Sequence, residues 1–268
     1  MHPIERLRYV ARASGADPSL LVRETAVALA DVARVEPVGL VPACRRLIQR
    51  HVTTGPIWWL AARVLTAADP VEEAWRAVAE VDDDPTERML SVALPDEATV
   101  VVVGWPDIGA RALHRRGDLE VLVVDSAGEG SALARALAGA GVETSAVPET
   151  GVGAAAMVCD LVMVEAEAAG PGGIIAPMGS HAAAAVASSA EVPVMAVAGV
   201  ARVLPAGLWD AMLRRLDDEG GEPWDRPVEL VPAGLLTSVF GPHGAQDVEA
   251  GLAQTTCPVA PELLRPAG

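Results

Sequence analysis

The chain has 268 residues, of which 51% are hydrophobic and 21% are charged, and its formal net charge is −16. This composition excludes a disordered or fibrous protein, and the negative charge opposes binding to nucleic acid or to an anionic membrane. All 20 basic residues are arginines. The absence of lysine excludes Schiff-base chemistry and a Walker A nucleotide site, because both need a lysine amine.

The three cysteines, Cys44, Cys159 and Cys257, fit neither a metal-binding spacing nor an even set of disulfides. We expect Cys44 and Cys159 to be small core residues. Charges interrupt Met1–Arg12, where a signal peptide needs an apolar run, and Val100–Val103 is too short to span a bilayer. We therefore expect a soluble cytoplasmic protein that uses no metal and no cofactor.

Residues 1–98 carry a helical period, which predicts an N-terminal helical domain. The four expected helices run from Pro18 through Leu29, from Val38 to Arg50, onward from Gly55-Pro56, and from Pro70 to Val81. The third contains Trp58 and Trp59, which point apart because they are adjacent. We expect one of them in the core and the other lining the cleft between the domains.

Residues 99–268 change to short apolar runs that alternate with helices. Such runs are typical of buried parallel strands, so this part predicts a Rossmann-like α/β domain with a doubly wound, mostly parallel sheet. The expected strands are Val100–Val103, Val121–Val124, Val142–Val147, Leu161–Val164 and Val194–Ala198, with a final short strand from Val228. Ligands of such a domain bind beyond the carboxyl ends of the strands.

The first candidate loop runs from Gly104 to Gly109 after the first strand, and Asp125 ends the second strand. A glycine turn followed by an acid about 20 residues later would suit a dinucleotide. However, the spacing is G-x-x-x-x-G, Pro106 removes an N–H group, and Trp105 would crowd a phosphate. An ordinary strand-to-helix turn with a solvated Asp125 is therefore the favoured interpretation.

The second candidate loop follows the fourth strand and carries Glu165 and Glu167, then Gly172 and Gly173, then a helix start at Gly179-Ser180. Buried carboxylates there could act as general acid or base, and the helix N-terminus could bind a phosphate. The simpler interpretation is that Ser180 caps the helix and the two glutamates face water. The residues alone favour this simpler interpretation.

The stretch from Cys159 to Ala198 resembles the signature of the initiation factor 2B alpha/beta/delta family, which includes methylthioribose-1-phosphate and ribose-1,5-bisphosphate isomerases. Asp160–Glu167 occupies the part D-x-V-x-V-G-A-D, and Pro171–Ser180 occupies N-G-G-V-x-N-K-x-G-T. His51–Leu60 is similar to the helix entry R-P-T-A-x-x-L-x-W-A-L, and Ser14-Gly15 sits where the isomerases have R-G. The resemblance implies an N-terminal helical domain and a C-terminal Rossmann-like domain.

The departures from that pattern affect the polar residues. The isomerases carry a cysteine in a T-H-C-N loop, and this chain has Gly104-Trp105-Pro106-Asp107 instead. The aspartate of G-A-D is Glu167, and the lysine of N-K is Pro177. The arginines of R-P-T and R-G-A are His51 and Ser14. The resemblance therefore implies a site from which most contacts to phosphate and sugar have gone.

From the resemblance we expect Glu167 and Asp107 as catalytic residues, if any reaction survives. The expected ligand-binding residues are Ser14, Gly15, His51, Thr53, Gly104, Trp105, Gly172, Gly173, Gly179 and Ser180. The leading hypothesis is a ligand-binding or regulatory protein that has lost aldose-ketose isomerisation. The alternatives are an altered sugar-phosphate isomerase that uses Glu167, and a nucleotide-binding Rossmann enzyme. We expect a phosphorylated sugar or a nucleotide as the ligand, and a homodimer or higher homo-oligomer as the assembly.

Overall fold

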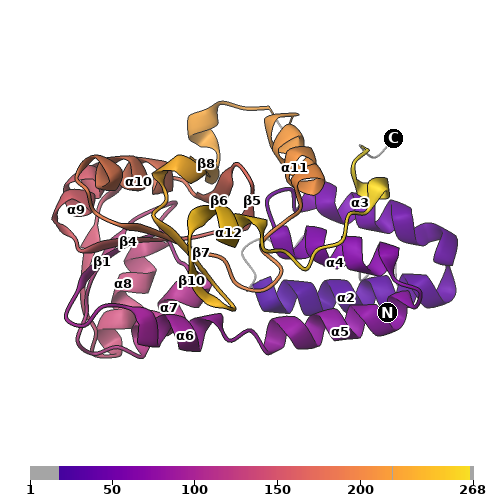
Figure 1. The fold of residues 1–268 in the computed structure, drawn as a ribbon, viewed down its shortest axis with the longest axis horizontal. Helices are drawn as coiled ribbons and strands as arrows, with labels where there is room; N and C mark the ends of the chain where they lie inside the picture. The colour runs from indigo at the N-terminus through magenta and orange to yellow at the C-terminus, as the bar shows by residue number, and fades with distance from the viewer. Residues whose placement is uncertain (1–17, 219, 266–268) are drawn as a thin grey trace. The chain divides into compact units, whose positions relative to one another are not determined.

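The computed structural model describes residues 18–218 and 220–265, which form two compact units (Figure 1). Unit 1 takes its residues from Met1–Asp84, Val200–Gly220 and Ala253–Gly268, and unit 2 consists of Pro85–Gly199 and Gly221–Leu252. The chain therefore leaves and re-enters each unit. Each is described below by itself.

Unit 1 is helical, as its sequence period predicts. Its helices are α2 (Pro18–Val35), α3 (Leu40–Arg50), α4 (Gly55–Thr66), α5 (Pro70–Asp82) and α11 (Ala206–Asp218), with short 3₁₀ turns η1 (Pro37–Gly39) and η5 (Pro261–Leu263). Helix α5 begins after Asp69, whose carboxylate accepts the N–H groups of Val71 and Glu72 at 2.9 and 3.1 Å. The four helices expected before residue 84 are all present.

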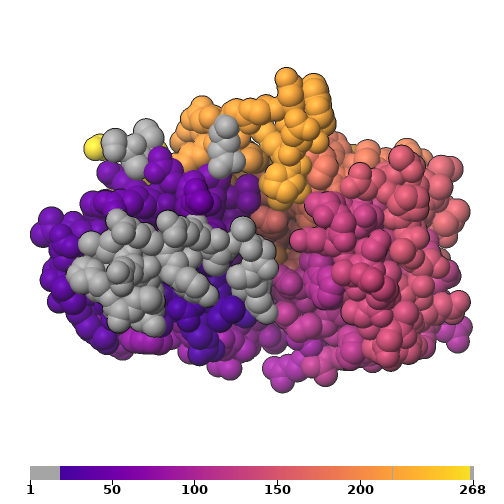
Figure 2. Space-filling view, turned by 180° about the vertical axis from the view of Figure 1, so that it is seen from behind, coloured from indigo at the N-terminus to yellow at the C-terminus, as the bar shows by residue number. Residues whose placement is uncertain are grey.

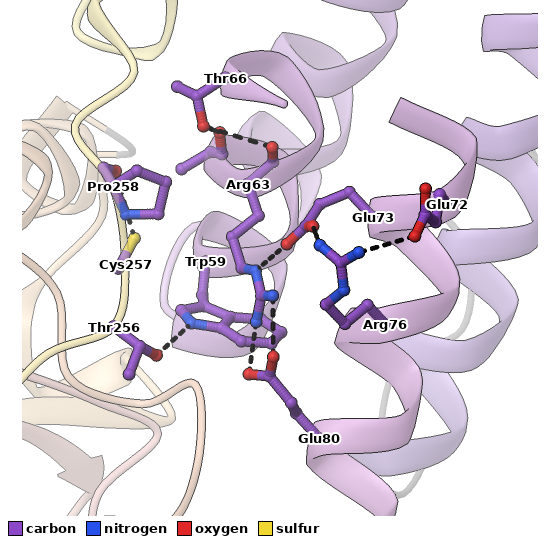
Figure 3. A network of polar contacts seen from close by, with 11 residues as sticks. Trp59, Arg63, Thr66, Glu72, Glu73, Arg76, Glu80, Thr256, Cys257 and Pro258 are labelled. Atoms are coloured by element: carbon purple, nitrogen blue, oxygen red, sulfur yellow. Dashed lines mark hydrogen bonds and ion pairs between the residues drawn. The ribbon is translucent and has the colours of Figure 1, made fainter. Parts of the chain in front are cut away.

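Both tryptophans of α4 are fully buried, so the expectation that one lines a cleft is wrong. Trp58 donates its indole N–H to the Val52 carbonyl at 2.9 Å, and Trp59 donates to the Thr256 hydroxyl at 3.0 Å. Arg63 stacks over Trp59 with its guanidinium carbon 4.4 Å from the ring centroid, and it pairs with the carboxylates of Glu73 and Glu80 (Figure 3). The two indoles do point apart, and unit 1 covers each of them.

Unit 2 contains a sheet of seven strands in the order β10-β9-β7-β4-β1-β2-β3, in which only β10 is antiparallel to its neighbour. These strands are β1 (Thr99–Val103), β2 (Glu120–Val124), β3 (Glu143–Val147), β4 (Leu161–Glu165), β7 (Val194–Val197), β9 (Ser238–Gly241) and β10 (Gly244–Gln246). The chain proceeds outward from β1 in one direction and then from β4 in the other. The doubly wound, mostly parallel α/β fold expected from the sequence is confirmed.

Helices cover both faces of this sheet (Figure 1). They are α7 (Asp107–His114) and α8 (Gly130–Gly139) on one face, and α9 (Val152–Val158) and α10 (Ser180–Ser189) on the other, with α6 (Thr86–Ala93) against α7 and the short α12 (Val248–Ala253) and 3₁₀ turn η3 (Pro223–Asp225) beyond. The valines of β1 are 0–4% exposed, because the sheet is buried on both faces. Figure 2 shows the surface of β1 through α10 in magenta to salmon.

A second, antiparallel sheet of three strands was not expected from the sequence. Its order is β5 (Ala168–Gly170), β6 (Gly173–Pro177) and β8 (Val228–Pro232), followed by the 3₁₀ turn η4 (Ala233–Leu235). Gly173 has φ +144°, and a Cβ added there would lie 2.2 Å from the Val231 carbonyl oxygen. Glycine is therefore required at this position for β6 to pair with β8. Over the described residues, no helix has the length and apolar character to cross a bilayer.

Candidate functional site

The candidate site lies in unit 2 at the carboxyl edge of the seven-stranded sheet, around the gap between β1 and β4. Strand order reverses there, and ligands of doubly wound sheets bind at such a switch point. β1 ends in Gly104, whose φ of +67° turns the chain and whose N–H donates to the Val124 carbonyl at 2.9 Å. Trp105 follows and is 40% exposed, so it is not packed into the core of unit 2.

Glu165 spans the switch point. It is the last residue of β4 and is 6% exposed, and its Oε2 accepts the N–H of Gly109 at 2.8 Å. Gly109 is the third residue of α7, whose N-cap residue Pro106 has no side-chain acceptor. Glu165 therefore caps α7 from the neighbouring strand. Its carboxylate serves this internal contact.

Glu229 does the same for α10. The N-cap residue of α10 is Gly179, with φ +98° and no side chain, and Glu229 of β8 supplies the missing acceptor. Its Oε1 accepts the N–H groups of Gly179 at 2.6 Å and His181 at 3.0 Å. Ser180 is fully buried and its hydroxyl has no hydrogen-bond partner, so it does not cap the helix.

A third carboxylate lies at the start of α8. Asp125 follows β2, and its Oδ1 accepts the N–H of Ser131 at 3.3 Å. The N-termini of α7, α8 and α10, all at the carboxyl edge, thus each receive a carboxylate of the chain itself. Positive partial charge gathers at helix N-termini, so these carboxylates lie where an anionic ligand would otherwise be favoured.

Ser126 and Pro177 join the loops of this edge. The Ser126 hydroxyl donates to the Met178 carbonyl at 2.9 Å. A Cβ added to Gly104 would meet the side chains of Ser126 and Pro177 at 3.5 and 3.6 Å. Pro177, at the position where the resemblance places a lysine, thus lies beside the turn after β1.

The two candidate catalytic carboxylates belong to the same edge. Asp107 is the first residue of α7, and Glu167 follows the end of β4, with its N–H donating to the Ile175 carbonyl at 2.8 Å. Both are partly buried. Because β4 ends at Glu165, the two glutamates do not share one face of a continuous strand.

The remaining candidate residues are distributed elsewhere. Gly172 and Gly173 form the turn between β5 and β6. His51 and Thr53 belong to unit 1, where His51 is the C-cap residue of α3 and donates its N–H to the Leu47 carbonyl. Ser14 and Gly15 lie outside the described residues.

The cysteines lack the surroundings of a reactive thiol. Cys159 is 5% exposed, and burial raises the pKa of its thiol. Burial also raises the pKa of Cys44 and of Cys257 to about 12. All three thiols therefore stay protonated at neutral pH, whereas nucleophilic cysteines have a lowered pKa. Among residues 18–218 and 220–265, no three His, Cys, Asp or Glu side chains are grouped to hold a metal ion.

Sequence reasoning missed Glu229 and Ser126. Glu229 is a single acid in the apolar strand V-E-L-V-P, and its role depends on the register in which Val228 faces Pro177. That pairing joins segments about 50 residues apart. The only signal in the sequence was the presence of Gly179 at a helix start, which predicts that a cap has to come from elsewhere.

Comparisons with known proteins agree with this architecture. Residues 107–215 match the model of the Initiation factor 2 subunit family. The resemblance to the initiation factor 2B family is confirmed. At the level of sequence, no curated protein matches this initiation factor 2B-like chain.

Solved structures of initiation factor 2B proteins share the fold. The Pyrococcus horikoshii OT3 translation initiation factor eIF-2B has a TM-score of 0.72 at 14% identity, with 91% of this chain and 96% of that chain covered. The tetrameric eIF2B-beta2-delta2 complex from C. thermophilum gives 0.75 at 18% identity, covering 93% and 92%. The eIF2B beta structure from Chaetomium thermophilum gives 0.68 at 17%, covering 92% and 86%.

Proposed function

We propose that this initiation factor 2B-like protein has lost sugar-phosphate isomerisation and acts as a ligand-binding or regulatory protein. The observation that supports this proposal is that Glu165, Asp125 and Glu229 occupy the N-termini of α7, α8 and α10. A phosphate at this edge would have to displace a carboxylate or bind beside one.

The energetic argument follows from the kinds of contact that hold a phosphate. Charge-assisted hydrogen bonds contribute about 1.5–3 kcal/mol each. Pro177, His51 and Ser14 stand where the resembling isomerases carry a lysine and two arginines. Their loss removes several kcal/mol of phosphate affinity, and the nearby carboxylates add repulsion.

Incubation with methylthioribose-1-phosphate and with ribose-1,5-bisphosphate, followed by NMR of the sugar carbons, tests the proposal. We expect both sugars to remain unchanged. An active isomerase of the family, run in parallel, establishes that the assay detects turnover. Conversion by this chain at enzymatic rates would overturn the proposal.

An altered isomerase that uses Glu167 is the second candidate. Its support is that Glu167 lies at the same edge as Asp107 and is only partly buried, unlike Glu165. In this model Glu167 is the base and Asp107 or His51 its partner. A Glu167→Gln variant that alters neither activity nor ligand binding would count against it.

A nucleotide-binding enzyme is less well supported, because Asp125, the acid expected on a ribose, accepts the Ser131 N–H instead. A flat thermal-shift response to NAD, NADP, S-adenosylmethionine and ATP would end that alternative. The helical domain over residues 1–98, the Rossmann-like domain over 99–268 and a cytoplasmic location are parts of the same proposal. The assembly we propose is a homo-oligomer, as the oligomeric complex among the similar structures suggests.

A further inference from the structure

The start of α10 combines three features that together concern its ligand chemistry. Glu229 Oε1 accepts two backbone N–H groups there, from Gly179 at 2.6 Å and His181 at 3.0 Å. Ser180, the first residue of the helix, is fully buried, and its hydroxyl has no partner. A Cβ added to Gly179 would contact Val103 at 3.5 Å, which places this start against the end of β1.

The surrounding charges have one sign. Asp107, Asp125, Glu165 and Glu167 follow the carboxyl ends of β1, β2 and β4, and Glu229 reaches the same edge from β8. Parallel strands bring those ends together on one side of the sheet. Like charges a few ångströms apart repel an incoming anion, and more strongly where the site is partly buried.

We propose that Glu229 is a built-in anion at the start of α10, and that it determines the ligand class of this edge by excluding phosphorylated ligands and admitting uncharged or cationic small molecules. This inference rests on the proposed loss of sugar-phosphate chemistry and adds to it the residue responsible and the class of ligand. Removal of the Glu229 carboxylate frees two N–H groups beside the unpartnered Ser180 hydroxyl. These are the donors that an inorganic phosphate needs.

Phosphate binding by variants provides the test. Inorganic phosphate is titrated into wild-type protein, Glu229→Ala and Glu229→Gln, with binding measured by calorimetry and the fold by circular dichroism. We expect Glu229→Ala to bind phosphate at least about tenfold more tightly than wild type, because one charge repulsion is lost and two donors are gained. Glu229→Gln keeps the shape of the cap and should give a smaller gain.

Two further variants make the result specific. Asp69→Ala removes a carboxylate that accepts two N–H groups at the start of α5, so it makes the same change of charge at another helix N-terminus. We expect it to gain no phosphate binding, because Glu72 and Glu73 lie in the first turn of α5. In the Glu229→Ala background, Ser180→Ala should weaken the gained binding.

Hydrogen exchange of wild-type protein decides the question without any variant. The amides of Gly179 and His181 should be protected, and phosphate should leave their exchange unchanged. Saturable phosphate binding by wild type that alters these amides would overturn the inference, as would a folded Glu229→Ala that binds phosphate no better than wild type. Turnover of a sugar phosphate would instead overturn the proposed function, so the two failures are distinguishable.

Discussion

At the scale of single residues, Arg63 carries the largest predicted effect on stability. Its side chain is 11% exposed, as is that of Glu73, and its Nη2 donates to Glu80 at 2.8 Å (Figure 3). Breaking a buried pair leaves an uncompensated charge, so Arg63→Met should lower the free energy of unfolding by about 3 kcal/mol. Urea denaturation measures this change.

Arg76→Met is the matched control for Arg63, because Arg76 pairs with the same Glu73 but is 54% exposed. Exposed pairs contribute about 0–1 kcal/mol, so this variant should unfold near the wild-type midpoint. Equal losses for the two variants would contradict the assigned burial. Arg63→Met combined with Glu73→Gln should recover part of the lost stability, since the second change removes the stranded carboxylate.

The cysteines give a second prediction at this scale. Cys44 and Cys257 are buried, and burial raises the pKa of each to about 12, so their thiolate fraction at pH 8 is about one in ten thousand. Together with Cys159, they should react with N-ethylmaleimide at least about a hundredfold more slowly in the native protein than in urea. Mass spectrometry of timed samples measures the difference. Complete labelling of the native protein on mixing would contradict the predicted burial.

At the scale of secondary-structure elements, the β5–β6–β8 sheet depends on Gly173. A Cβ at this position would lie 2.2 Å from a backbone oxygen that cannot move without breaking the pairing with β8. Gly173→Ala should therefore cost more than about 3 kcal/mol or yield insoluble protein. Gly234→Ala is the control, since a Cβ there meets nothing within 4 Å. Thermal unfolding that is equal for both variants would contradict the pairing.

The elements that the sequence predicted well are those with dense apolar signals. Val100–Val103 and Val121–Val124 appear within β1 and β2, because buried parallel strands are continuous runs of branched residues. β5, with the sequence Ala-Ala-Gly, and β10, with Gly-Ala-Gln, have low strand propensity and exist only through their partners. α6 is eight residues long and follows an acidic run, which hid its period.

The candidate site was less predictable than the fold for a related reason. Its loops could be located, since Gly104, Glu165 and Gly179 each follow or precede a recognisable element. The use of the carboxylates could not, because whether Glu165 faces water or α7 depends on three-dimensional proximity across 56 residues. Local patterns do not contain that information.

At the scale of the whole molecule, we expect a homo-oligomer. Light scattering coupled to size exclusion should give a mass of at least twice 27.6 kDa, independent of moderate salt. Salt screens charge, so an assembly held by apolar contact should persist when ionic strength rises. A mass of 27.6 kDa at every concentration tested would contradict this expectation.

The distance along the chain between α10 and its cap has a consequence for the order of folding. Gly179 and His181 obtain their acceptor from Glu229, 50 and 48 residues later. Until β8 has been synthesised and paired with β6, the first turn of α10 lacks that acceptor. We therefore expect this turn to become ordered late, after the central strands, and to fray first on unfolding, because contacts between distant segments require closure of a long loop.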